Sequence, residues 1–275
     1  MTPEMEIICV GNDLLIGKIP NTNAQWLSKQ STNLGITIKR ITVIADNVDE
    51  IANEIQETLR RKPKFIITTG GLGPTFDDKT LEGIAKALNR KLEVNEKALE
   101  MVKEKCETYA TKTGTNNTEL TQPQIKMATI PEKTHPIPNP VGTAPGVQAN
   151  LEGTILIALP GVPSEMEAIF KRTIFPLLKQ TSRGNAFHEK SIYADNIMES
   201  NLAPLIDEVM QDNPGIYIKS HPRGAENKPH LEIHFSITAK DDEKPEERLQ
   251  KAGNQLALLI ERNRGKTCSS QSINS

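Results

Sequence analysis

The chain has 275 residues, of which 36% are hydrophobic and 25% charged, and its formal net charge at pH 7 is −2. This length accommodates one large domain or two smaller ones, and the composition is typical of a soluble globular protein. The near-neutral charge gives no general attraction to nucleic acid or to a membrane surface, so neither is expected as a partner. No apolar run approaches the ~20 residues that a membrane-spanning helix needs.

The cysteines and the amino terminus predict a cytoplasmic protein. Cys9, Cys106 and Cys268 are far apart, none has the spacing of a metal-binding pair, and an odd number argues against a disulfide framework. The first residues lack the basic region and long apolar stretch of a signal peptide. A reducing compartment fits both observations.

The first 88 residues alternate between apolar runs of strand length and segments with helical periodicity. We expect strands at 5–10, 36–45 and 65–67, and helices at 24–34, 49–61 and 81–88. Asn23 is the predicted cap of the first helix. This alternation predicts βαβ units and a parallel sheet, whose ligand lies beyond the carboxyl ends of the strands. Asn12, Asp13 and Asp46 follow such ends.

The segment from Thr68 to Thr80 reads TTGGLGPTFDDKT and lies between a predicted buried strand and a helix. Strand, glycine-rich loop and helix is the arrangement in which backbone N–H groups hold a phosphate. No Gly-Lys-Ser/Thr follows the glycines, which excludes a P-loop, and their spacing differs from G-x-G-x-x-G. We therefore predict a phosphate site of another kind, centred on Gly70, Gly71 and Gly73.

Two adjacent acids in this segment suggest a cation. Asp77 and Asp78 would repel a phosphate unless a divalent metal ion lay between them, and hard metals bridge carboxylate and phosphate oxygens. The plain alternative is a tight turn in which an aspartate or Thr80 caps the next helix. The crowding of glycines with acids favours the site over the turn.

The middle of the chain contains two further loops of small residues, Gly142–Gly146 and 160–167. Before them we expect a helix at 95–111, a loop at 113–118 and a short helix or strand at 125–130. A hairpin is predicted at 147–151 and 154–159. Ser164 and Glu167 match a capping box for a helix that runs from 165 to about 178.

Beyond a linker near residue 183 the pattern changes to strand, helix, strand, strand, helix, which predicts a small α+β domain. We expect a first domain at 1–180, the α+β domain at 186–265 and a disordered tail at 266–275. His230, Glu232 and His234 would share one face of a strand. Alternating polar residues of this kind usually face water, so a solvent-facing strand is favoured over a metal site.

The motif at 68–80 resembles the signature of the CinA family's N-terminal domain, which belongs to the larger group of molybdopterin-binding MoaB/MogA-like domains. Segments 11–17, 142–146 and 159–166 resemble three more motifs of that family in the same order. The resemblance implies an α/β fold: a three-layer MoaB/MogA-like domain with a mostly parallel sheet, followed by a small α+β KH-like domain. The KH-like domain lacks a GxxG loop, so RNA is not expected as a partner. A homo-oligomer is expected, with a dimer favoured.

Two departures from the family pattern matter. Asp13 stands where the family usually has glutamate, so the carboxylate is kept but is one methylene shorter. The chain also stops before the family's C-terminal nicotinamide-nucleotide deamidase domain. We therefore expect no deamidase activity.

The resemblance leaves three alternatives for function. The first is a metal-dependent nucleotide pyrophosphatase that cleaves the phosphoric anhydride of ADP-ribose- or FAD-like dinucleotides, with Mg, Mn or Co as the metal. The second is a molybdopterin-binding protein or adenylyltransferase of molybdenum cofactor biosynthesis. The third is a nucleotide-binding scaffold without catalysis. The paired acids and the Pro74-Thr75 insertion favour the first over the second.

In the favoured hypothesis Asp78 and Asp77 are the catalytic residues, and with Asp46 they hold the metal ion. Asp78 is the stronger candidate because it matches the acid shared with MoaB/MogA proteins. The residues predicted to bind substrate are Gly70, Gly71, Leu72, Gly73, Pro74, Thr75, Thr80, Asn12, Asp13, Gly142, Thr143, Ala144, Pro145, Gly146, Pro160, Gly161 and Glu165.

Overall fold

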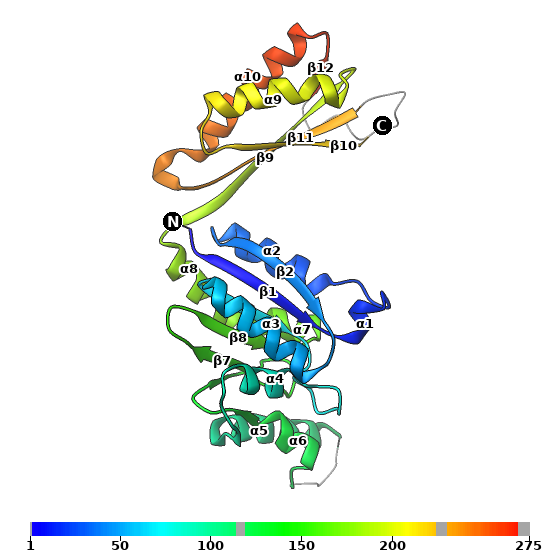
Figure 1. Ribbon diagram of the computed structural model, residues 1–275, viewed down its shortest axis with the longest axis vertical. Coiled ribbons are helices and arrows are strands. Elements are labelled where there is room, and N and C mark those ends of the chain that lie inside the picture. Colours follow the sequence, from blue (N-terminus) through cyan, green and yellow to red (C-terminus); the bar gives the residue numbers. More distant parts are fainter. Residues whose placement is uncertain (1, 114–118, 224–229, 269–275) are drawn as a thin grey trace. The chain divides into compact units, whose positions relative to one another are not determined.

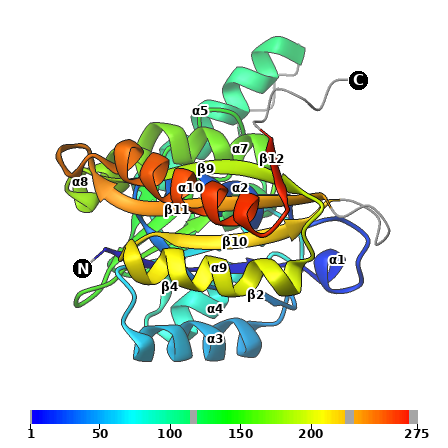
Figure 2. The same cartoon turned by 90° about the horizontal axis from the view of Figure 1, so that it is seen from above.

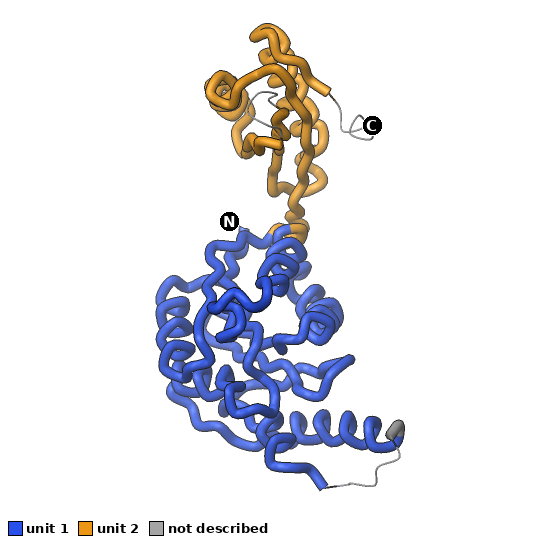
Figure 3. Tube along the Cα trace, turned by 90° about the vertical axis from the view of Figure 1, so that its right-hand side faces the viewer, with its two compact units in different colours: residues 1–32, 36–182 blue, residues 33–35, 183–275 orange. Residues whose placement is uncertain are grey.

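The computed structural model describes residues 2–113, 119–223 and 230–268. The chain divides into two compact units (Figure 3). Met1–Thr32 and Ile36–Ser182 form the first, and Asn33–Gly35 and Arg183–Ser275 form the second. The predicted loop at 113–118 lies outside the described residues except for its first residue.

A six-stranded sheet in the order β2-β1-β3-β8-β7-β6 forms the centre of the first unit. The first four strands in this order are parallel, and β7 and β6 are antiparallel to their neighbours. The strands are β1 (Glu4–Val10), β2 (Thr37–Ile44), β3 (Phe65–Thr69), β6 (His135–Ile137), β7 (Gly146–Asn150) and β8 (Ile155–Leu159). The α/β fold with a mostly parallel sheet is thus confirmed.

Helices cover both faces of this sheet, as the sequence alternation predicts. The helices α3 and α4 lie on one face and α2 and α7 on the other (Figure 1, Figure 2). Their bounds are α2 (Thr22–Asn33), α3 (Val48–Arg61), α4 (Thr80–Ala87) and α7 (Pro163–Ile169). A π-helical turn (Phe170–Ile174) continues α7 into α8 (Phe175–Ser182).

Among the described residues, the remaining elements of the first unit are three helices and a small two-stranded sheet outside the central sheet. A one-turn helix, α1, occupies part of the loop expected after β1, and a two-stranded sheet pairs β4 with β5. The bounds are α1 (Asn12–Leu15), β4 (Leu92–Val94), α5 (Glu96–Thr113), α6 (Gln122–Met127) and β5 (Thr129–Pro131). The segment at 125–130, expected as either a helix or a strand, contains the end of α6 and the start of β5.

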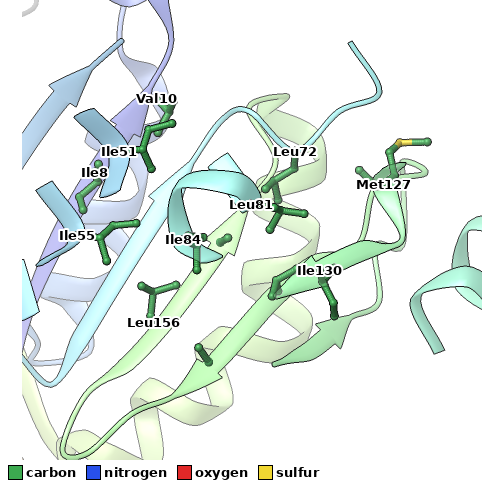
Figure 4. Close-up of a cluster of buried hydrophobic side chains, with 14 of the residues drawn as sticks. Ile8, Val10, Ile51, Ile55, Leu72, Leu81, Ile84, Met127, Ile130 and Leu156 are labelled. Carbon is green, nitrogen blue, oxygen red and sulfur yellow. The ribbon is translucent and has the colours of Figure 1, made fainter. Parts of the chain in front are cut away.

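The apolar core between the sheet and α3 and α4 follows from alternation along β1. Ile8 and Val10 point to the same face of the strand and pack with Ile51 and Ile55 of α3 (Figure 4). These two helix positions are four residues apart and so lie on one side of the helix. The strand β3 is buried along its whole length, as expected for a continuous apolar run in a parallel sheet.

The second unit is an antiparallel sheet in the order β10-β11-β9-β12, with two helices on one face (Figure 1). Its elements are β9 (Asn185–Asp195), α9 (Glu199–Asp212), β10 (Tyr217–Pro222), β11 (His230–Lys240), α10 (Pro245–Arg262) and β12 (Lys266–Cys268). The expectation of a disordered tail from residue 266 is wrong for its first three residues. They form β12, because backbone pairing with Tyr193–Asp195 compensates for their polar side chains.

Two predicted helix caps are also wrong. Val162 precedes α7 without a side-chain cap, and Ser164 lies inside the helix, because Pro163 is already set for the first helical position. In α2, the side chain of Asn21 rather than Asn23 accepts the cap bond, from Ala24 N at 3.1 Å. This leaves Asn23 available for contacts outside its own helix.

No helix in the described ranges combines the length and apolar character required to cross a bilayer.

A largely buried ion pair joins β1 to α3. Glu6 is 4% exposed and accepts three hydrogen bonds from Arg61, two from Nε at 2.9 and 3.1 Å and one from Nη2 at 2.7 Å. Arg61 also reaches Glu54 at 3.2 Å. The bidentate geometry compensates for removing the Glu6 carboxylate from water.

We expect Arg61→Met to lower the free energy of unfolding by about 3 kcal/mol, because Glu6 then stays buried without its partner. Urea denaturation measures the loss. The double variant Glu6→Met/Arg61→Met should recover most of it. Lys39→Met, which breaks the exposed Lys39–Glu4 pair, is the control and should cost less than ~1 kcal/mol. If Arg61→Met and Lys39→Met lowered the free energy of unfolding equally, this role for the buried pair would be contradicted.

Candidate functional site

The segment between β3 and α4, Gly70–Lys79, is here called the strap, and the hydroxyl of Thr80 closes it. Thr80 is fully buried, and its Oγ1 donates to the carbonyl of Gly70 at 2.7 Å. Its backbone N–H donates to the carbonyl of Gly71 at 3.1 Å. Thr80 therefore folds the strap back onto the start of α4, and the structure assigns its hydroxyl to the strap rather than to a ligand.

The first two glycines are required by close packing. A Cβ on Gly70 would lie 2.2 Å from the carbonyl oxygen of Val10, and one on Gly71 would lie 2.4 Å from Thr80 Oγ1. Both residues also have positive φ, of 105° and 67°. Only glycine meets both conditions, and the strap can thus lie directly against β1.

The strap presents a run of backbone donors. Within the described residues, no hydrogen bond uses the N–H of Gly71, Leu72 or Gly73, whereas the N–H of Gly70 donates to Leu159 O at 3.0 Å. Consecutive free N–H groups in a loop form a concave site for an anion. Residues 71–73 are therefore the candidate donors of the predicted phosphate cradle, which stays a prediction.

The far end of the strap is a turn held by its own side chains. Thr75 N donates to Asp78 Oδ2 at 2.8 Å, and Thr75 Oγ1 lies 2.5 Å from both Asp77 Oδ1 and Asp78 Oδ2. One hydroxyl proton can serve only one carboxylate at a time, so the two acids compete for it. Lys126 of α6 donates to the carbonyl of Thr75. Lys126 was missed because it is fifty-one residues away in sequence.

The first cavity lies at the carboxyl ends of the parallel strands and has a volume of about 330 Å³. It brings together most of the polar residues that sequence reasoning placed at this edge. The predicted residues that line it are Asn12, Asp13, Asp46, Gly70, Gly71, Asp77 and Gly161. The convergence follows from parallel topology, because the strands all end at the same edge.

Asn23 connects three segments around the first cavity, and sequence reasoning treated it only as a cap. Its Nδ2 donates to Thr69 Oγ1 at 3.0 Å and to the carbonyl of Gly161 at 2.8 Å. Its Oδ1 is buried without a partner among the described residues. A buried acceptor without a donor is costly unless a ligand or water supplies one. Asn23 is therefore a candidate ligand contact.

The second cavity, also about 330 Å³, lies on the other side of the strap. Gly71 lines both cavities, and Asp78 lines the second whereas Asp77 lines the first. The second cavity is lined by Gly71, Leu72, Gly73, Asp78, Leu81, Glu82, Leu92, Gln122, Ile125, Lys126 and Thr129. Adjacent acids thus belong to different cavities.

The predicted metal ligands Asp46, Asp77 and Asp78 are not gathered into one group. Among the described residues, no cluster of three or more His, Cys, Asp or Glu side chains could hold a metal ion. Asp46 and Asp77 do share the first cavity. Mg²⁺ commonly uses one or two protein carboxylates and completes its shell with water and substrate phosphates. These two acids fit that mode, and the metal stays a prediction.

The loop Gly142–Gly146 and Glu165 line neither cavity. Asn139 holds this loop: its Nδ2 donates to Ala144 O at 2.9 Å and to Glu165 Oε2 at 2.7 Å. A Cβ on Gly142 would lie 2.1 Å from the Glu165 carboxylate. The structure thus gives Glu165 a role in loop packing. The other predicted residues that line neither cavity are Pro74, Thr75, Thr80 and Pro160.

The polar face of β11 pairs its histidines with acids. His230 Nδ1 lies 2.7 Å from Asp195, and His234 Nε2 lies 2.9 Å from Glu189. Glu232 accepts hydrogen bonds from Arg223. The three side chains are partly buried and each has a charged neighbour, and the choice between a polar face and a metal site stays a prediction.

The Thr75 hydroxyl gives a pH prediction. Its hydrogen bond to Asp77 is the main reason why the pKa of that carboxyl is lowered, with Lys126 adding to the effect. Thr75→Val should raise the pKa of Asp77 toward the ordinary aspartate value, because the charged form loses its donor. Carbon-13 NMR of the carboxyl group measures this, and Thr75→Ser is the control that keeps the lowered pKa. An unchanged pKa in Thr75→Val would contradict the assignment.

Comparison with known proteins gives a consistent result. Residues 6–180 match a family described as probable molybdopterin binding domain. A protein of Pyrobaculum calidifontis is 43% identical over 259 residues, which cover 94% of this chain and 96% of that protein. A protein of Saccharolobus solfataricus is 40% identical over 261 residues, covering 94% and 93%. The crystal structure of CinA from Thermoplasma acidophilum, of unknown function, is 40% identical with a TM-score of 0.57, covering 63% of this chain and 98% of that one.

Proposed function

Because this chain belongs to the family of probable molybdopterin binding domains, we propose that it binds a phosphorylated heterocycle, of which molybdopterin is the first candidate. The family match supports molybdopterin binding, the second alternative of the sequence analysis, more directly than it supports hydrolysis. The observation that carries the proposal is the run of free N–H groups at Gly71, Leu72 and Gly73, of which Gly71 lines the first cavity. Such a run is suited to a phosphate.

The first cavity offers acceptors for the rest of the ligand. Asp13 and Asp46 place two carboxylates in its lining. A pterin ring carries N–H and amino donors, which match such acceptors. Ile19 and Leu14 give the same cavity apolar surface for a ring face. Polar groups that fix orientation within a partly apolar pocket are typical of small-molecule sites.

Isothermal titration calorimetry tests this proposal on the purified protein. A phosphorylated pterin should bind at least about tenfold more tightly than the same pterin without phosphate, a difference of about 1.4 kcal/mol. Inorganic phosphate should compete with the phosphorylated form only, because it occupies the strap. Equal affinity for both pterins would show that the strap does not bind the phosphate.

The second candidate function is hydrolysis of a phosphoric anhydride in ADP-ribose- or FAD-like dinucleotides. It is favoured by the position of Asp46 and Asp77 in the cavity that Gly71 also lines. These two acids would hold a divalent cation, which would neutralise charge on the anhydride when bound. The N–H groups of the strap would stabilise the phosphate oxygens. Asn12 N donates to Asp46 Oδ2 at 2.7 Å and so orients that carboxylate.

Hydrolysis predicts that Asp77→Asn lowers metal-dependent turnover by about 100-fold, because one of two cation-holding carboxylates is lost. Release of AMP from ADP-ribose or FAD with Mg²⁺, Mn²⁺ or Co²⁺ is measured by chromatography, and EDTA should abolish it. Asp49→Asn removes an exposed aspartate that lines neither cavity and serves as the control. Undiminished turnover in Asp77→Asn would exclude this role, and no turnover in the wild type would exclude the function.

Two further parts of the proposal rest on the resemblance found in the sequence. We infer that the second unit is KH-like and contributes to self-association rather than to RNA binding. The order β9, α9, β10, β11 and α10, to which β12 is added, supports the KH-like assignment. Light scattering after size-exclusion chromatography, on the full chain, tests whether the protein is a dimer.

A further inference from the structure

The strand β9 of the second unit is paired along its whole length on one side and only at one end on the other. β11 pairs with Asn185–Asp195, whereas β12 pairs only with Tyr193–Asp195. Within the described residues, no backbone hydrogen bond joins Ala186–Ile192 to a segment other than β11. Every second residue of a strand points its N–H and C=O groups to the same side. This stretch therefore presents a row of unpaired donors and acceptors, which is a template for another strand.

A cavity of about 360 Å³ lies beside this unpaired edge. Residues 190–192 of β9 line it, together with Thr267 and Cys268 of β12 and four residues of α10. The α10 residues are Gln250, Gly253, Asn254 and Ala257, whose spacing places them on one face of the helix. An exposed sheet edge beside a groove is the arrangement in which peptide-binding domains take up an extended segment as an extra strand.

Gly253 keeps this groove open. It is buried in the middle of α10, where glycine destabilises a helix relative to alanine. Its φ is not positive, and an added Cβ would meet only Ile192 Cγ2, at 4.0 Å, which is ordinary van der Waals contact. Neither the backbone nor the packing of the chain therefore requires a glycine here. What the missing side chain does provide is space between α10 and the edge of β9.

β12 shows how an extended segment lies against this edge. It runs antiparallel to β9, and Thr267 pairs with Ala194. The Thr267 side chain faces α10, because its Oγ1 donates to Glu261 at 3.2 Å. Side chains alternate along a strand, so a segment that continued in this direction would face α10 opposite Ile192 and again opposite Lys190.

These two positions define the side chains that the groove accepts. Opposite Ile192, the small residues Gly253 and Ala257 leave room for a small apolar side chain. Opposite Lys190, a carboxylate is favoured by charge. The Lys190 ammonium donates to Gln250 Oε1 and retains two more donors.

We propose that the groove between β9 and α10 binds an extended segment of a partner protein, which adds antiparallel to β9 in line with β12. The segment carries a small apolar side chain opposite Ile192 and an acidic side chain two residues later, opposite Lys190. Main-chain hydrogen bonds supply the affinity, and the two side chains supply the specificity. This inference is independent of the strap and of its ligand.

Titration of the isotope-labelled full chain with the synthetic peptide acetyl-VTETVT-amide, followed by NMR, tests the proposal. The first valine is designed to lie opposite Ile192 and the glutamate opposite Lys190, so the amide signals of residues 188–192 should shift. The same peptide with lysine in place of glutamate should bind at least about tenfold more weakly, because two like charges then face each other.

Two N-methylated peptides test strand addition itself. One carries N-methyl groups on its odd-numbered residues and the other on its even-numbered residues. Only one of these sets has its N–H groups directed at β9, so one peptide should lose at least about tenfold in affinity and the other should not. Equal binding of the two peptides would exclude the addition of a strand.

Gly253→Leu fills the groove from the helix and should weaken binding of acetyl-VTETVT-amide at least about tenfold. Leucine favours a helix more than glycine does, so this variant should keep its fold, and its melting temperature checks this. Glu246→Leu is the matched control, because Glu246 is an exposed residue of the same helix that does not line the cavity. It should bind the peptide as the wild type does.

The other occupants of the groove give different results. If acetyl-VTETVT-amide binds only to a chain that ends at Cys268, the residues after Cys268 close the groove, and docking of a partner is excluded. If Gly253→Leu turns a wild-type dimer into a monomer in light scattering, the groove belongs to a contact between copies, and the proposal is likewise overturned. No binding of the peptide to the wild type would also overturn it.

Discussion

The hydrogen bond from Thr80 to the carbonyl of Gly70 is the contact on which the candidate site depends. It is buried, and it turns the strap back onto the start of α4 immediately after the central strand. The turn brings the Gly70 backbone so close to Val10 that no side chain would fit. With the strap held in this way, the N–H groups of residues 71–73 have no partner among the described residues. A structural hydrogen bond thereby creates an unsatisfied surface suited to an anion.

Two contacts from distant parts of the chain complete the site. Asn23 joins the start of α2 to Thr69 and to the loop after β8, while Lys126 holds the far end of the strap from α6. Neither residue is next to the glycine motif in sequence. The site is therefore assembled from the tertiary fold, and its shape depends on packing well beyond the motif itself.

The parallel sheet and much of its ligand edge could be predicted from the sequence. Strand periodicity and chain order place Asn12, Asp46 and the strap at the same edge, and the first cavity contains all three. This prediction works because parallel topology converts strand ends into spatial neighbours. It requires no knowledge of individual side-chain contacts.

The errors arise where a short-range pattern competes with another constraint. Ser164 and Glu167 match a capping box, but Pro163 begins the helix two residues earlier than expected. Residues 266–268 have a polar sequence, but pairing with β9 makes them a strand. Glu165 follows a small-residue loop, but Asn139 uses it to hold that loop. At residues 266–268 and at Glu165 a partner distant in sequence decided the outcome, whereas at Ser164 the adjacent proline did.

The paired acids show the same effect and change how the strap is understood. Adjacent in sequence, Asp77 and Asp78 suggest a single cation site. The turn at Thr75 separates them, so that Asp77 lines the first cavity with Asp46 and Asp78 lines the second with Glu82. Asp78 also accepts the Thr75 N–H and stabilises the turn. Both acids contact Thr75, but only Asp78 also accepts its backbone N–H, so a substitution at Asp78 should disturb the turn more than one at Asp77. The turn at Thr75 thus divides the doubled acid between two cavities.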